Sequence, residues 1–168
     1  SPSRGRRFCR ILTQEGGFCR SISVENLREA TEVRASIEGL AVKLAMRNIT
    51  PEHLGALAQL LDDMDEAFKR RSIERYTALH YRFHKYIVEM SRNQILMRLY
   101  LSITEPFVTN RITSMYFKEL PRYKKVSHRK IYELLASGKA SKANRLIEQH
   151  VMALLNSIAP PSKKTGKE

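Results

Sequence analysis

Four histidines are spaced so that a helical fold can bring their imidazoles to one point: His80, His84, His128 and His150. The first two are four residues apart in a stretch of helical periodicity, so their rings leave one helix face a turn apart. The last two lie ten residues before and twelve after Gly138. In a helical hairpin closed there, they stand about 15 and 18 Å from the turn, at similar heights. Imidazoles bind Zn, Ni, Cu and Fe, so this spacing predicts a metal site.

Other catalytic motifs are missing from the sequence. It contains no Gly-rich phosphate loop, no serine nucleophile elbow and no Cys-x-x-Cys pair. Its two cysteines, Cys9 and Cys19, are expected to be free thiols. The fifth histidine, His53, belongs to no motif and is expected at the surface of a helix.

Size and composition indicate one folded domain. The chain has 168 residues, of which 42% are hydrophobic, enough for a core. No apolar run approaches the ~18 residues of a membrane span, and no signal peptide is recognisable. The sequence therefore predicts a cytoplasmic protein with no membrane partner.

The net charge of +13 raises the alternative of a nucleic-acid-binding bundle. Arginines gather between residues 4 and 10 and lysines between 163 and 167, whereas charges of both signs alternate in between. Such basic ends predict weak, salt-sensitive phosphate contacts that read no sequence. Basic charge near a pocket also favours an anionic small molecule.

Helical periodicity runs through most of the chain and predicts an all-α fold. The expected helices cover 23–48, 51–68, 72–91, 93 onward with a kink or break at Pro106, 121–137 and 140–158. Short connections favour an antiparallel bundle of about six to seven helices. Strand signal is confined to 8–12 and 18–22 around Gly16-Gly17, which predicts a short N-terminal β-hairpin.

The first helix carries a charged residue on its apolar stripe. Val33, Ile37 and Leu40 are expected to face the core, and Arg34 turns inward with them. A buried guanidinium needs an acidic partner. Glu38, one helical turn further on, is one candidate for that partner.

Five stretches in this order resemble the C-terminal sensing domain of the FadR branch of GntR-family transcription regulators, over about residues 20 to 158. They are Glu32–Glu38, Phe83-His84, Ser91–Asn93, Ser127–Ile131 and Gly138–His150. The resemblance implies a dimeric antiparallel helical bundle with a central cavity. In many members one Asp and three His hold a divalent metal there, and an organic acid binds on or beside it.

The chain departs from the family's pattern at His80, where the family usually has Asp. A divalent ion on one Asp and three His leaves the site at about +1, whereas on four His it leaves about +2. An all-nitrogen shell favours Zn or Ni over Mn or Mg, and the extra charge favours an anionic ligand. Direct binding of the acid by the imidazoles, without a metal, is the alternative.

The resemblance also implies residues that contact the effector. Arg34 is expected either to clamp the effector's carboxylate or to form a structural pair with Glu38. The remaining candidates are Arg111, Tyr81, Tyr132 and Asn93, for which solvation, core packing and helix capping are the respective alternatives.

Together these features predict the effector-binding domain of a bacterial transcription regulator, not an enzyme. A basic N-terminal segment, 1–22, resembles the end of a DNA-reading wing, 23–158 form the sensing and dimerisation domain, and 159–168 form a basic tail. The expected partners are a small organic acid and a second copy, with DNA bound only through a reader domain that this chain lacks. The alternative is a metal-dependent enzyme acting on a small carboxylate.

Overall fold

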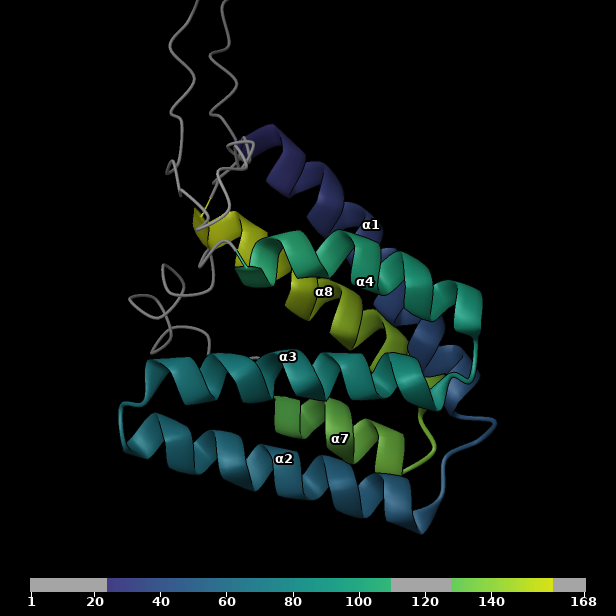
Figure 1. Cartoon of the computed structure of the whole chain (residues 1–168). Helices are drawn as coiled ribbons and strands as arrows, with labels where there is room; N and C mark the ends of the chain where they lie inside the picture. The colour runs from purple at the N-terminus through teal and green to yellow at the C-terminus, as the bar shows by residue number, and fades with distance from the viewer. Residues whose placement is uncertain (1–23, 110–127, 159–168) are drawn as a thin grey trace, which may run out of the picture.

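Six α-helices make up the part of the chain that the structure, a computed structural model, describes: residues 24–109 and 128–158. They are α1 (Val24–Ala45), α2 (Pro51–Lys69), α3 (Ile73–Met90), α4 (Gln94–Thr109), α7 (His128–Ala136) and α8 (Ala140–Ile158) (Figure 1). These two ranges contain no strand, so the all-helical prediction is confirmed there. The hairpin predicted within 1–22 lies outside the described residues.

Local signals explain where two helices begin. The Thr50 hydroxyl accepts a hydrogen bond from the main-chain N–H of His53, and His53 Nδ1 accepts one from the N–H of Thr50, forming a capping box ahead of α2. At α4, Asn93 Oδ1 accepts hydrogen bonds from the main-chain N–H groups of Ile95 and Leu96, at 3.1 and 3.0 Å. His53 is therefore half-buried in a capping role, and its ring meets that of Tyr86 edge-on.

A left-handed glycine joins α7 to α8. Gly138 has φ +72°, a conformation that costs glycine little and other residues more. The N–H of Lys139 reaches back to the carbonyl of Leu134 at 2.9 Å. The helical hairpin expected at this glycine is thus present.

The helix boundaries differ from expectation at one proline. α4 continues past Pro106 to Thr109, so of the kink or break predicted there, the break was wrong. A proline removes one main-chain hydrogen bond and crowds the preceding turn, which a helix can tolerate near its end. Of the helix predicted over 121–137, the structure describes the portion from His128 as α7.

The helices pack around one core. α1 lies along α8 and also contacts α3 and α4, while α2 packs on α3 and α7 (Figure 1). Gly39 allows the close approach of α1 to α8, because a Cβ built on it would clash with the side chains of Glu148 and Asn144. The largest completely buried side chains are Tyr100, Phe83, Leu57, Ile87, Ile131, Leu135 and Ile147.

Two residues of the predicted stripe on α1 face outward. Ile37 is buried, but Val33 is 50% exposed and Leu40 is 45% exposed, so their assignment to the core was wrong. α1 packs against α8, α3 and α4, and these three helices leave Val33 and Leu40 largely uncovered. Among the described residues, no helix is long and apolar enough to span a membrane.

Candidate metal centre

Four imidazoles meet where α3, α7 and α8 converge. His80 and His84 come from α3, His128 begins α7, and His150 lies in α8. Their ring centroids are 4.3 to 6.1 Å apart, and one ligand nitrogen from each lies within 4.8 Å of the others. We call these four residues the histidine cluster.

A buried carboxylate supports the cluster from α1. Glu38 is 0% exposed, and its Oε2 lies 2.5 Å from Nδ1 of His84, which is also 0% exposed. Burial raises the pKa of Glu38, but the charges and hydrogen bonds of Arg34 and His84 lower it to about 2. Because the carboxylate is ionised and can only accept, His84 Nδ1 carries the shared proton. Nε2 of His84 therefore presents a lone pair to the centre of the cluster.

Arg34, Glu38 and His84 form a continuous series of polar contacts. Nε of Arg34 donates to Oε1 of Glu38 at 2.5 Å, and the Arg34 side chain is 19% exposed. Each carboxylate oxygen of Glu38 thus has a partner. The structural pair predicted as one alternative for Arg34 is present, and the pairing is extended to His84.

Burial favours the neutral form of three of the imidazoles. It is the main cause that lowers the pKa of His80 and of His128 well below the ordinary value, and the neighbouring histidines and Arg34 add to the effect. For His84, burial also lowers the pKa, although Glu38 opposes the shift. Neutral imidazole is the form that binds metal ions.

The donor set fits a divalent transition metal. Nε2 of His84 and Nε2 of His128 are 3.2 Å apart. A tetrahedral ion with metal–nitrogen bonds of about 2.1 Å needs neighbouring nitrogens about 3.4 Å apart, close to this separation. The four histidines can therefore hold a metal ion.

Neighbouring side chains hold the cluster from outside. Phe83 is completely buried, and its ring meets that of His128 edge-on at 5.1 Å. Next to His128, Arg129 reaches across to α2, where its Nη2 contacts Asp62 at 2.9 Å and Asp65 at 3.0 Å. This contact anchors the first turn of α7, and with it the backbone of His128.

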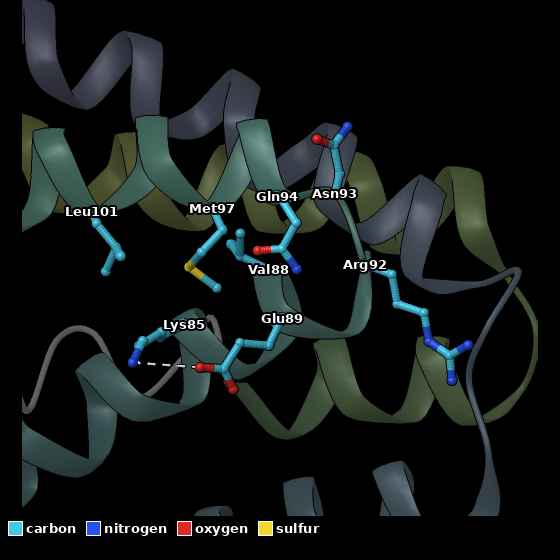
Figure 2. Close-up of a pocket in the computed structure, with 8 residues that line it drawn as sticks. All are labelled: Lys85, Val88, Glu89, Arg92, Asn93, Gln94, Met97 and Leu101. Atoms are coloured by element: carbon cyan, nitrogen blue, oxygen red, sulfur yellow. Dashed lines mark ion pairs between the residues drawn. The ribbon is translucent and has the colours of Figure 1, made fainter.

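The structure does not gather the other predicted effector residues, Tyr81, Tyr132, Arg111 and Asn93, at one place that it describes. Tyr81 and Tyr132 are half-buried against the core, and Arg111 lies outside the described residues. Asn93 caps α4 and is one of the residues that line a surface groove of about 320 Å³ between α3 and α4. Lys85, Glu89 and Met97 also line this groove (Figure 2). Asn93 is not one of the residues gathered at the cluster.

Sequence reasoning missed two residues. Glu38 was considered only as a partner of Arg34, although an acid within the apolar stripe of α1 was a signal that it serves another buried group. Tyr100 was not singled out as a candidate for the site. It is completely buried, and the charges of Glu38 and Arg34 reach its phenol.

Two curated relatives are named as transcription regulators. The chain is 26% identical over 145 residues to the probable D-xylose utilization operon transcriptional repressor of Paenarthrobacter nicotinovorans, covering 86% of this chain and 63% of that protein. It is 26% identical over 151 residues to the Nta operon transcriptional regulator of Aminobacter aminovorans, covering 90% of this chain and 70% of that one. The chain thus spans about two thirds of the length of these relatives.

A solved structure shares the fold. E. coli McbR/YncC superposes with a TM-score of 0.70 at 20% sequence identity, covering 82% of this chain and 71% of that one. The family model described as FCD domain matches residues 29–153, which include all four clustered histidines. The chain therefore belongs to the FCD domain family of transcription regulators, as its resemblance to the FadR branch of GntR-family regulators predicted.

Proposed function

We propose that this domain senses a small organic acid at a divalent transition metal held by the histidine cluster. The observation that carries the proposal is the convergence of four imidazole nitrogens within 4.8 Å of one another. The all-nitrogen donor set favours zinc or nickel. When bound, the metal supplies a positive centre that attracts a carboxylate. The regulator names of the relatives do not favour the alternative of a metal-dependent enzyme.

Arg34 supports the acid-sensing part of the proposal. It contacts Oε1 of Glu38, whose Oε2 contacts His84, so one carboxylate links Arg34 to the histidine cluster. A guanidinium has five N–H donors, enough to serve Glu38 and a ligand carboxylate together. We assign Arg34 to both contacts. Tyr81 and Tyr132 remain candidates for the wall of the acid site.

Metal analysis of the protein purified without a histidine tag tests the centre. About one zinc or nickel per chain is expected, whether retained or taken up on addition. His84→Ala should abolish binding, because it removes both the ligand and the contact with Glu38. His53→Ala, which alters a histidine outside the cluster, should bind as the wild type does. Metal below ~0.1 per chain with no uptake would refute the metal site.

A second copy of the chain is the proposed partner at the α1/α4 face, which we define by Val33, Leu40, Ile95 and Leu99. These are four of the five large apolar side chains exposed among the described residues, and the fifth is Ile73. α1 packs against α4. Exposed apolar residues gathered on adjoining helices are typical of a protein interface.

Charge favours a second copy as the occupant of this face. The exposed acids of α1 lie in its first half, at Glu25, Glu29 and Glu32. The exposed bases, Lys43 and Arg47, lie at its other end. A two-fold axis crossing the middle of α1 would bring acidic ends against basic ends, as a self-complementary interface requires.

Sedimentation velocity tests the α1/α4 face. The wild type should sediment as a dimer, and Leu99→Glu should raise the dimer dissociation constant at least ~10-fold, because it places a charge in an apolar contact. Ile73→Glu, a matched change outside the face, should leave the dimer intact. A monomeric wild type, or an unaffected Leu99→Glu dimer, would refute this interface.

Within a complete regulator, we assign sensing and dimerisation to residues 23–158 and sequence-specific DNA contacts to other segments. The present chain should then bind DNA only weakly through its basic charge. In gel-shift assays, such binding should disappear by about 200 mM salt and show no preference for sequence. Nanomolar, sequence-selective binding by this chain would contradict the assignment.

A further inference from the structure

Tyr100 places a hydroxyl group inside the protein without a partner. The residue is 0% exposed, and among the described side chains its hydroxyl is the buried polar group that has no hydrogen-bond partner. A phenol buried in a core normally hydrogen-bonds through its hydroxyl, since desolvation without a partner carries a free-energy cost. Phenylalanine would fill the same space without that cost, so packing alone does not account for a tyrosine here.

Tyr100 packs against Tyr81, a candidate for the wall of the proposed acid site. It lies on α4, next to α1 and α3, and its ring stacks on that of Tyr81 with centroids 6.3 Å apart and planes 19° from parallel. Burial raises the pKa of Tyr100, the charge of Glu38 raises it further, and the charge of Arg34 opposes the shift. Tyr100 therefore stays protonated near neutral pH and can donate a hydrogen bond.

The hydroxyl of Tyr100 makes no hydrogen bond to Glu38 in the structure. The two oxygens of Glu38 contact Arg34 and His84 instead. The hydroxyl is therefore left able to donate to an oxygen that a bound ligand would supply.

We propose that the hydroxyl of Tyr100 donates a hydrogen bond to an oxygen of the bound organic acid and so determines which acids are recognised. This assignment rests on the proposed function. Together with the metal and Arg34, Tyr100 would provide a third point of attachment. Three such points select acids with several oxygens, such as hydroxy acids, dicarboxylates or sugar acids, over simple monocarboxylates.

Titration calorimetry on zinc-loaded protein tests the assignment with two matched pairs, L-malate with succinate and L-lactate with propionate, and with D-gluconate and citrate. Tyr100→Phe should weaken binding of the best acid about 10-fold, the effect of losing a hydrogen bond to a charged or polar ligand oxygen. A loss confined to the hydroxylated member of a pair identifies a ligand hydroxyl as acceptor. An equal loss for both members identifies a carboxylate oxygen.

Two further readouts separate this role from a structural one. Tyr100→Phe should retain the wild-type zinc content, and its ligand-free form should unfold at the same urea concentration as the wild type or a higher one, because a hydroxyl without a partner is removed. The control, Tyr86→Phe, alters a half-buried tyrosine that contacts His53 and should bind acids as the wild type does.

Three results would overturn the assignment. The first is acid affinity in Tyr100→Phe within about twofold of wild type. The second is a less stable ligand-free variant, which would show that the hydroxyl has a structural partner. The third is a zinc-loaded wild type that binds none of the six acids, which would refute the acid-sensing proposal as well.

Discussion

His84 donates a hydrogen bond from Nδ1 to the carboxylate of Glu38 over 2.5 Å, and both side chains are completely buried. The two residues are 46 positions apart and join α1 to α3. Glu38 also binds Arg34. This one carboxylate therefore connects Arg34, which is proposed to hold the acid, with His84, which is proposed to hold the metal. An acid bound by Arg34 alongside Glu38 would therefore alter the surroundings of His84. Such a change transmits a signal only if the acid prefers one packing of the helices.

Glu38→Gln should weaken metal binding with little change in shape. The amide cannot hold His84 Nδ1–H as strongly as a carboxylate does, so we expect zinc affinity to fall about 10- to 100-fold, as when other supporting carboxylates of histidine ligands are lost. Competition with a chromophoric chelator would measure the affinity. Glu89→Gln is the matched control, because Glu89 pairs with Lys85 at the surface. Equal affinity in the two variants would contradict the supporting role of Glu38.

Substitution of Arg34 should affect both stability and acid binding. Arg34→Ala removes one partner of a buried carboxylate, and we expect the free energy of unfolding to fall by about 3 kcal/mol. If Arg34 also clamps the acid, affinity should fall by about 1.5–3 kcal/mol. Urea unfolding and calorimetry measure the two effects separately. Arg34→Lys keeps the charge but not the planar guanidinium, so it should recover more stability than acid affinity. Unchanged acid affinity with reduced stability would leave Arg34 a structural residue only.

The metal-free protein should lose stability as the pH falls below about 6.5. The pKa values of His80, His84 and His128 are lowered in the folded state, so below the ordinary value of 6.5 the unfolded chain takes up protons that the folded chain does not. Glu38, with its pKa lowered from 4.5 to about 2, adds a further loss below pH 4.5. Urea unfolding in EDTA between pH 8 and 5 checks the first effect. Stability that stays flat or rises across this range would contradict the neutral, buried state of these histidines.

Arg129→Ala should weaken metal binding without touching a proposed ligand. The contacts of Arg129 with Asp62 and Asp65 hold the first turn of α7 on α2, and His128 is the neighbouring residue. Exposed ion pairs contribute about 0.2–1 kcal/mol each, so we expect a loss of zinc affinity of roughly threefold to tenfold. Lys130→Ala is the control, because the ion pair of Lys130 with Glu133 lies within α7. If both variants bind zinc as the wild type does, the anchor does not position His128.

The histidine cluster could be predicted from the sequence, because it depends on helix spacing and on one helix end. The spacing of His80 and His84 places both on one helix face wherever that helix packs. Gly138 marks a helix end because the left-handed backbone suits glycine, and this sets the heights of His128 and His150 along a hairpin. Each of these features depends on residues close in the chain, so it can be inferred before any packing is known.

Tertiary structure decided which neighbours each helix face meets. Val33, Ile37 and Leu40 follow the same helical period, yet α1 buries only Ile37 among the three. Arg34 and Glu38 were a recognisable pair, but the second oxygen of Glu38 meets His84 only because α1 packs on α3. Nothing in the spacing of the residues around Tyr100 shows that its hydroxyl is buried without a partner among the described side chains, because that depends on how α4 packs. Helical periodicity shows which residues share a face, whereas the partner of that face depends on contacts between distant segments.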